Sequence, residues 1–322
     1  MITGGAGFIG YHLARYLSLF DNQIVIADNF QKNNQDQDLM VLGSKYNLTT
    51  VNVDLKDPNQ LDKIKGSYDY IYHLAAIVGV QNVLKNPWNV LDDGIAILEN
   101  VINLAKAQKQ LDRFIFASSS EVYDQTLKLN NNCIPTSESC PITVPDLRHS
   151  RATYMLAKIY GEALCVHSGL PYTIFRPFNI YGPRMGMAHV IPETIKKINM
   201  ANDGGVIDVW NLNHSRTYCY IDDAVKMIKK CVEHKNAKNS VFNIGSSGPE
   251  ITVIELVKII SKICHRNVVV NEVNIDDGSP ARRCPDVSQI NCLTGHKAIV
   301  SLEKGLQLTC NWYKKNRFYR CA

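Results

Sequence analysis

Short apolar runs alternate with longer amphipathic stretches through the first half of the chain. The apolar runs predict buried strands, and they lie at residues 24–27, 50–53, 70–74, 114–117 and 172–175. Between them apolar residues recur at helical spacing, as at residues 95–107. Each parallel strand needs a crossover connection, usually a helix. The alternation therefore predicts an α/β protein with a Rossmann-like, doubly wound parallel sheet.

After Arg176-Pro177 the pattern changes to shorter pieces separated by Pro and Gly. One clear helix is predicted where Thr252 and Glu255 form a Thr-x-x-Glu capping box before an apolar run. We expect residues 1–177 to form the sheet domain, with residues 224–245 returning to it. Residues 178–322 otherwise form a smaller mixed α/β lobe at the C-terminal end.

Composition narrows the class of protein. The 322 residues are 45% hydrophobic and 20% charged, with a net charge of +5, which is ordinary for a globular protein. The densest basic run, residues 314–317, is too short to indicate nucleic acid. No run approaches the roughly 18 apolar residues that span a bilayer, and no signal peptide is recognisable. The ten cysteines show no CxxC pair and no metal-ligand spacing, which favours free thiols in a reducing compartment. We expect a cytoplasmic protein with no metal, nucleic-acid or membrane partner.

A glycine-rich loop stands at the start of the chain. Gly4, Gly7 and Gly10 are spaced three apart, with Phe8 and Ile9 between the last two, and the loop leads into an amphipathic helix predicted at residues 11–19. Such glycines allow a tight turn and close backbone approach to a pyrophosphate, which the helix N-terminus attracts. A plain turn is the competing interpretation. Only two residues precede the loop, so either the first strand is short or the numbering starts inside a longer chain.

The next predicted strand ends in an acidic residue. Asp28 lies about twenty residues past the loop, where a carboxylate accepts both ribose hydroxyls of NAD and repels the 2′-phosphate of NADP. Asn29 follows it, so no basic residue stands there to favour NADP. The alternative is an aspartate that merely closes a strand. The pattern favours NAD as cofactor.

Tyr154 and Lys158 form a Tyr-x-x-x-Lys pair in a segment predicted to be helical. The i,i+4 spacing puts both side chains on one face. An ammonium and a nicotinamide cation near a phenol lower its pKa, so Tyr154 can take a proton from a sugar hydroxyl while hydride leaves the same carbon for NAD. The motif alone is common on helix surfaces.

Residues 118–123, Ser-Ser-Ser-Glu-Val-Tyr, directly follow the predicted strand 114–117. The carboxyl end of a parallel strand is where open α/β sheets place ligands, and a serine there can hydrogen-bond the reacting oxygen. For any one of these serines, the alternative to a catalytic role is an ordinary serine-rich turn at the end of a strand. Three such elements in the right order are much less often accidental.

With these motifs the chain resembles the extended short-chain dehydrogenase/reductase family, specifically its NAD-dependent nucleotide-sugar epimerases, dehydratases and decarboxylases. The resemblance covers nearly the whole length. It implies Ser119, Tyr154 and Lys158 as catalytic residues. The implied cofactor-binding residues, which include the catalytic Tyr154 and Lys158, are otherwise Gly4, Gly7, Phe8, Ile9, Gly10, Asp28, Asn29, Asp54, Leu55, Leu74, Ala75 and Ala76.

The resemblance also implies where the substrate binds. The segment 176–183 matches Arg-Pro-x-Asn-x-Tyr-Gly-Pro, with Asn179 near the sugar diphosphate, and Arg216 in segment 215–223 grips that diphosphate. The implied partner is a nucleotide-diphosphate sugar, by default a UDP-sugar. The helices around 88–109 and 152–167 carry apolar residues on more than one face and imply a homodimer. In one departure, Asp93 or Gly94 replaces an asparagine that usually contacts the cofactor.

The reaction that follows oxidation at C4 stays open. Ser120 and Glu121 stand where the family's dehydratases and decarboxylases place an acid–base pair, and Glu121 is favoured as a base at C5 over a solvated glutamate. Arg283, in Arg-Cys-Pro-Asp, fits the decarboxylases, although a phosphate or a surface role fits equally. UDP-hexose 4-epimerisation is the alternative reaction. The alternative from another class is a non-catalytic nucleotide-sugar-binding protein.

Overall fold

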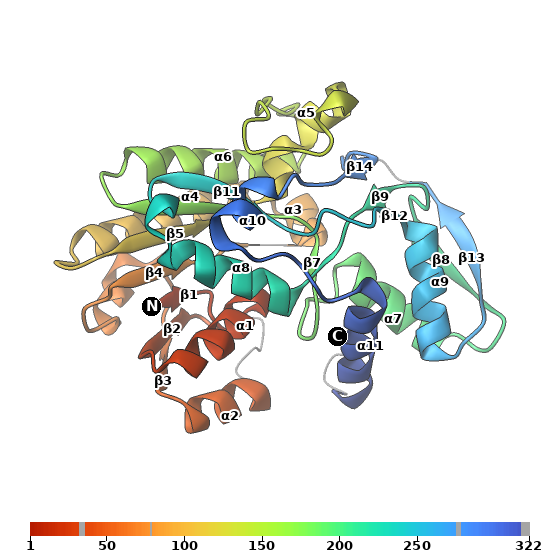
Figure 1. Ribbon diagram of the computed structural model, residues 1–322, viewed down its shortest axis with the longest axis horizontal. Coiled ribbons are helices and arrows are strands. Elements are labelled where there is room, and N and C mark those ends of the chain that lie inside the picture. The colour runs from red at the N-terminus through yellow and green to blue at the C-terminus, as the bar shows by residue number, and fades with distance from the viewer. Residues whose placement is uncertain (32–35, 78, 275–277, 317–322) are drawn as a thin grey trace.

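A seven-stranded parallel sheet forms the centre of the protein (Figure 1). The computed structural model describes residues 1–31, 36–77, 79–274 and 278–316; Arg317 of the basic run and Cys321 lie outside the described residues. The strand order is β11-β6-β5-β4-β1-β2-β3, and every pairing is parallel. The strands are β1 (Ile2–Thr3), β2 (Ile24–Asp28), β3 (Leu48–Asn52), β4 (Tyr70–His73), β5 (Arg113–Ala117), β6 (Tyr172–Pro177) and β11 (Ser240–Ile244).

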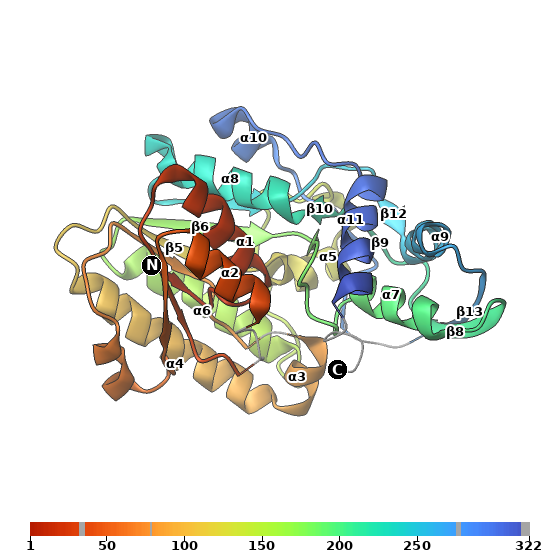
Figure 2. The ribbon, with the colours of Figure 1, turned by 90° about the horizontal axis from the view of Figure 1, so that it is seen from below.

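Helices cover both faces of the sheet, as Figures 1 and 2 show from two directions. On one face lie α1 (Phe8–Leu17) and α8 (Ile221–Glu233), and on the other α4 (Pro87–Lys106) and α6 (Ala152–His167). The remaining helices of this part are α2 (Gln37–Lys45), α3 (Val80–Lys85) and α5 (Asp124–Leu129). This arrangement confirms the predicted doubly wound sheet. The five predicted strands agree with the structure to within two residues at each end.

The chain leaves the sheet after β6 and comes back to it. Helix α8 packs beside α1, and β11 then pairs with β6 in register, Phe242 opposite Phe175. Apolar side chains on each face make two separate core clusters, one around Leu13 and Ile228 and the other around Phe114 and Val101. The sheet is thereby held rigid, and loops at its carboxyl edge can carry a site.

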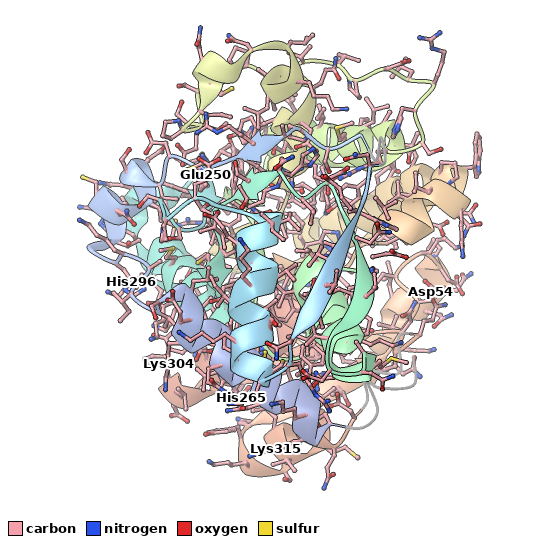
Figure 3. The ribbon with its side chains drawn as sticks, turned by 90° about the vertical axis from the view of Figure 1, so that its right-hand side faces the viewer. Asp54, Glu250, His265, His296, Lys304 and Lys315 are labelled. Carbon is pink, nitrogen blue, oxygen red and sulfur yellow. The ribbon has the colours of Figure 1, made fainter. Side chains whose placement is uncertain are left out.

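The smaller lobe is built from short strands and three helices within the described residues. Its elements are β7 (Ile180–Tyr181), α7 (Val190–Met200), β8 (Gly205–Trp210), β9 (Ser215–Arg216), β10 (Cys219–Tyr220), β12 (Ile251–Thr252), α9 (Val253–Cys264), β13 (Val268–Val273), β14 (Arg282–Arg283) and α11 (Leu302–Lys315). Helix α10 (Ser288–Thr294) instead packs on α8 and β11 of the sheet domain. Figure 3 looks onto this lobe, with α9 and the parallel pair β8–β13 across its face.

The predicted capping box at Thr252 is present: its hydroxyl accepts from Glu255 N at 3.3 Å, and Glu255 accepts from Thr252 N at 2.7 Å. The lobe has more helix than the sequence analysis predicted. Pro192 concealed α7, yet it lies in the first turn, where its missing N–H breaks no helical bond. Helix α11 begins at an N-cap, Ser301, and has a mostly polar outer face, so it lacks a long apolar run.

Candidate active site

Helix α6 presents Tyr154 and Lys158 toward the carboxyl end of β5. The Lys158 Nζ lies 5.7 Å from the centre of the Tyr154 ring. It donates a hydrogen bond of 2.8 Å to the carbonyl of Ala117, the last residue of β5. Lys158 is buried and Tyr154 is half-buried. The predicted pair therefore lies on one helical face, held against the edge where the sheet places ligands.

Ser119 lies beside the same tyrosine. Its hydroxyl oxygen accepts from the backbone N–H of Glu121 at 3.1 Å, which starts a short 3₁₀ turn at Ser120–Tyr123. A hydrogen bond from the Ser119 side chain to Tyr154 works to lower the pKa of the phenol. Ser118 instead donates to Glu162 at 2.5 Å, and Ser120 is buried. The structure thus brings Ser119, Tyr154 and Lys158 together.

Burial sets the electrostatics of the pair. It raises the pKa of the Tyr154 phenol well above its usual value, and the charge of Glu121 adds to that rise. Burial also lowers the pKa of the Lys158 ammonium to about 8. Both groups are driven toward their neutral forms, so a further positive charge beside the phenol is needed before much phenolate forms at neutral pH.

Three charged side chains, Glu121, Arg151 and Arg283, act on the Tyr154 phenol, and Asp124 joins them through ion pairs. We call these four residues the charge cluster. The Arg151 Nη2 lies 2.8 Å from Glu121 Oε2 and 4.0 Å from Asp124 Oδ2. The Arg283 Nη2 donates to both oxygens of Asp124, at 2.7 and 2.6 Å. Side-chain exposure ranges from 2% for Asp124 to 21% for Glu121. These ion pairs are therefore largely shielded from water and interact strongly.

The two carboxylates of the cluster respond differently. Burial alone raises the pKa of Glu121, but the charges of Arg151 and Arg283 outweigh it and the pKa is lowered. Burial raises the pKa of Asp124 to about 6, although Arg283 works against that rise. Glu121 is therefore ionised at neutral pH and suited to accept a proton, whereas Asp124 titrates close to neutrality.

Sequence reasoning missed Arg151 and Asp124. A signal for each was available: Arg151 stands three residues before Tyr154, and Asp124 three after Glu121, so helical geometry brings each to the side of its partner. Arg283, for which phosphate and surface roles were both open, is only 8% exposed. Its neighbour Arg282 is the exposed member, paired with Glu250 at 2.8 Å.

The glycine loop lies at the end of β1. A Cβ at Gly4 would approach Ala75 N to 2.7 Å, and one at Gly10 would approach Gly4 O to 2.5 Å. The φ of Gly4 is +64°. Gly7 is the N-cap of α1 without a side-chain cap, and Phe8 and Ile9 begin the helix. Backbone crowding therefore requires glycine here, and the uncapped helix N-terminus is suited to a pyrophosphate.

The structure places Asp28 at the end of β2, against this loop. One carboxylate oxygen accepts from Ala6 N at 3.1 Å and the other from Phe30 N at 2.9 Å. Two backbone bonds fix the carboxylate, and each oxygen keeps a further acceptor site for a ribose hydroxyl. Asn29 is exposed, and its side-chain oxygen accepts from Gln31 N at 3.2 Å.

The other predicted cofactor residues border the same edge. Asp54 accepts from Lys56 N at 3.0 Å, and the carbonyl of the buried Leu55 accepts from Asn100 Nδ2 at 2.9 Å. The Leu74 N–H donates to Thr3 O at 3.1 Å, which holds the segment 74–76 beside β1. One cavity joins this segment to the catalytic helix. Its lining includes His73, Ala75, Ala76, Gly94, Phe116, Tyr154 and Lys158.

These residues fit NAD. The loop leaves room for a pyrophosphate where no side chain can stand, and Asp28 is held in place to accept a hydrogen bond from a ribose. Tyr154 needs one further positive charge beside it to form phenolate, and a nicotinamide cation carries that charge. Gly94, which with Asp93 is one of the two positions predicted to replace the family's asparagine, lines the cavity and lies close to Ala157: a Cβ there would be 3.5 Å from that residue's Cβ.

Asn179 and Arg216 lie in the smaller lobe. The Asn179 Nδ2 is buried and has no hydrogen-bond partner among the residues that the structure describes, and its φ is 39°. A buried amide donor without a partner is costly unless a ligand supplies one. The Arg216 guanidinium is also buried and donates to the carbonyls of Pro280 and Ala281 at 2.8 and 2.9 Å. Asn179 thus offers a free donor, whereas Arg216 ties down the segment before β14.

The described residues offer neither a metal site nor a membrane-spanning helix. Within them, His, Cys, Asp and Glu side chains nowhere gather in threes as a metal would require. None of the helices in this part of the chain combines the length and apolarity that crossing a bilayer takes.

Known proteins with this fold are similar over the whole chain. A UDP-N-acetyl-alpha-D-glucosaminuronate decarboxylase of Bacillus cytotoxicus is 29% identical over 98% of this chain and 97% of its own. A UDP-glucuronic acid decarboxylase 1 of Xenopus tropicalis is 27% identical over 98% of this chain and 72% of its own. The crystal structure of a Bacillus cereus UDP-glucuronic acid 4-epimerase, in complex with UDP-glucuronic acid and NAD, is 25% identical, covers 98% of each chain and has a TM-score of 0.83.

The model of the NAD dependent epimerase/dehydratase family matches residues 1–245. This match confirms the resemblance to extended short-chain dehydrogenases and the cofactor predicted from Asp28. The protein belongs to the NAD dependent epimerase/dehydratase family and is an NAD-dependent enzyme.

Proposed function

We propose that this enzyme oxidises the sugar of a UDP-hexuronic acid at C4 and then releases its carboxyl group as CO2. One observation carries the proposal: Arg151 pairs with the ionised Glu121 and Arg283 with the adjoining Asp124, and both charges act on Tyr154, so two guanidiniums stand at the sugar end of the site. A carboxylate on the sugar is the group that guanidiniums bind best. The two decarboxylases among the similar proteins agree with this assignment.

Our mechanism begins at the C4 hydroxyl. Tyr154 takes its proton, Ser119 holds the oxygen by a hydrogen bond, and Lys158 stabilises the phenolate. The contribution of the cofactor is to accept the hydride from C4 and later to return it. The residues that hold the cofactor are the glycine loop and Asp28, with the segments at Asp54 and Ala75 beside them.

Oxidation makes a ketone at C4, which places the C6 carboxylate β to a carbonyl. The C5–C6 bond then breaks, its electron pair passes to the C4 oxygen as an enolate, and CO2 leaves. C5 takes up one proton, which we assign Glu121 to draw from water and pass on, so that each turnover consumes one proton from the solvent. Tyr154 returns its proton when C4 is reduced again, so the sequence is redox-neutral and regenerates every group.

Asn179, Arg216 and Arg283 complete the proposal on the substrate side. We assign the unpartnered amide of Asn179 to the diphosphate. Arg216, together with the backbone it holds at 280–281, borders the same group. We accordingly assign residues 1–177 and 224–245 to NAD and the rest of 178–322 to the nucleotide sugar.

4-Epimerisation is the second candidate, because the solved relative that holds UDP-glucuronic acid and NAD is a 4-epimerase. Dehydration is the third, because an ionised Glu121 can remove the C5 proton. Incubation with UDP-glucuronate, UDP-glucose and their N-acetyl analogues, followed by mass spectrometry, distinguishes the three. Loss of 44 mass units supports decarboxylation, loss of 18 dehydration, and an unchanged mass with a new retention time epimerisation. A protein that binds these sugars without converting any contradicts the enzyme assignment.

We further propose a homodimer formed through α4 and α6. Trp88, Tyr160 and Val166 on these helices are 76%, 42% and 43% exposed. Apolar groups gathered on two packed helices are typical of an interface. Light scattering after size exclusion should give twice the 36.2 kDa chain mass, and Val166→Glu should give a monomer. We keep a cytoplasmic location within this proposal, since the nine described cysteines are free thiols.

A further inference from the structure

The charge cluster joins the two parts of the chain. Asp124 stands at the start of α5, directly after the Ser120–Tyr123 turn, whereas Arg283 belongs to β14 in the smaller lobe. Their side chains are 2% and 9% exposed, and one guanidinium nitrogen contacts both carboxylate oxygens. Arg151, beside the catalytic helix, reaches the same lobe through Ser279 Oγ at 2.8 Å. The sugar end of the site is thus closed by ion pairs between the lobes.

Arg283 has a second, unused donor. Its Nε is buried and has no hydrogen bond within the described part of the chain. Its charge also acts on Glu121, Tyr154 and Tyr218. Arg283 therefore lies within electrostatic range of the catalytic tyrosine, with one nitrogen taken by Asp124 and a donor left over. A substrate anion that reaches Arg283 meets a carboxylate already there.

We propose that Asp124 is a specificity-determining residue whose carboxylate occupies the anion-binding side of Arg283 until an anionic group of the substrate takes its place. The inference rests on the proposed function. Two anions on one buried guanidinium repel each other, so Asp124, which is itself buried, must take up a proton when the substrate binds. This protonation costs affinity, and the cost discriminates against ligands that do not bring a strong anion to Arg283.

Proton uptake gives a readout in the unmodified chain. The charged groups that face Asp124 are Arg283, Arg151 and Glu121. With a pKa of about 6, Asp124 is mostly ionised at pH 7.5, and a substrate anion beside it raises that pKa further. Calorimetric titration in two buffers of different ionisation enthalpy should show uptake of a substantial fraction of one proton.

The direct test is Asp124→Asn in the NAD-loaded Tyr154→Phe protein, where binding is measured without turnover. UDP-glucose and UDP-glucuronate are titrated separately. We expect the dissociation constant to fall about tenfold and the proton uptake to disappear. Tighter binding of both ligands identifies the displacing anion as the diphosphate, and tighter binding of UDP-glucuronate alone identifies it as the sugar carboxylate. Unchanged or weaker binding of both, with the melting temperature retained, overturns the inference.

Glu250→Gln is the matched control. It removes the carboxylate partner of the neighbouring Arg282, which lies 2.8 Å away and is exposed; Figure 3 labels Glu250. We expect unchanged affinities, since Arg282 is exposed. If Asp124→Asn does not fold, absence of proton uptake by the Tyr154→Phe parent overturns the inference by itself. Failure of that parent to bind either nucleotide sugar contradicts the proposed function instead.

Discussion

The guanidinium of Arg151 lies 2.8 Å from the carboxylate of Glu121, one helical turn before the phenol of Tyr154. One residue at the start of α6 thus fixes the charge state of Glu121, while another, three positions on, supplies the phenol. The two proton carriers of the site are thereby oriented by the same helix.

Arg151→Met should raise the pKa of Glu121, because burial then acts with only Arg283 and His189 opposing it. We expect kcat at pH 7 to fall by about 10- to 100-fold, because Glu121 loses the guanidinium that orients it. Arg151→Lys should recover part of the rate. Arg148→Met is the matched control: Arg148 pairs with Asp146 at 3.0 Å but its side chain is 91% exposed, so kcat should not change. Equal losses in both variants would contradict this role.

Tyr154→Phe should retain NAD and lose turnover by about two to four orders of magnitude, because it removes the proton carrier while keeping the ring. NAD content is measured on the denatured protein, and turnover by product mass. The finding that would end the mechanism is a rate close to that of the wild type.

Glu121→Gln should separate the two stages of the reaction. Oxidation at C4 does not use Glu121 in our mechanism, so NADH absorbance at 340 nm should still appear under single-turnover conditions. Product should form at least tenfold more slowly, because the proton at C5 has lost its carrier. An unchanged product rate would show Glu121 to be a bystander.

The fold followed from the sequence where one periodicity dominated. The strand at 24–27 and the capping box at Thr252 were readable because local pattern and tertiary environment agree there. Helix α7 could not be predicted in this way, because a proline usually interrupts a helix, and the sequence does not show that Pro192 lies in the first turn, where it is tolerated. The return of β11 to the side of β6 depends on contacts across a long sequence separation, which spacing only suggests.

The residues of the active site also fall into those that the sequence predicted and those that it did not. Ser119, Tyr154 and Lys158 belong to continuous motifs, and the structure brings them together. Arg283 carried a motif, but its partner could not be predicted: Asp124 lies 159 positions away in sequence. Ion pairs between the lobes depend on how the lobes pack together. The distance between two residues along the sequence does not predict which of them meet there.

Gly10→Ala tests the cofactor loop. Its Cβ would stand 2.5 Å from Gly4 O and 2.6 Å from Gly5 Cα, both backbone atoms that cannot move aside cheaply. We expect a loss of about 1–3 kcal/mol in stability and NAD-free protein after purification. Gly43→Ala in α2 is the control, because the nearest atom is 3.7 Å from the new Cβ. It should keep NAD and gain up to about 1 kcal/mol from helix propensity. Normal NAD content in Gly10→Ala would contradict the loop's role.

The pH dependence of the reaction should belong to Tyr154 and Lys158 as a pair. At low pH both are protonated, and the phenol cannot act as a base. Burial sets the first loss of a proton at about pH 8 on Lys158, while the pKa of Tyr154 is raised far above that. The singly protonated pair contains a constant share of phenolate with ammonium, which is the reactive form. The rate should therefore rise with pH and level off, with an apparent pKa at or below about 8, since the charge of a bound nicotinamide moves the limb only downward.

Lys158→Met should move that limb upward by more than one pH unit, because the phenolate then forms without the ammonium and against burial. The measurement is kcat/KM of the NAD-loaded enzyme between pH 5.5 and 10. At pH 7 the variant should be slower by at least tenfold, and the deficit should shrink as the pH rises. A deficit that stays constant across the range would mean that Lys158 only positions the cofactor, because a positioning loss does not depend on which of the two groups holds the proton.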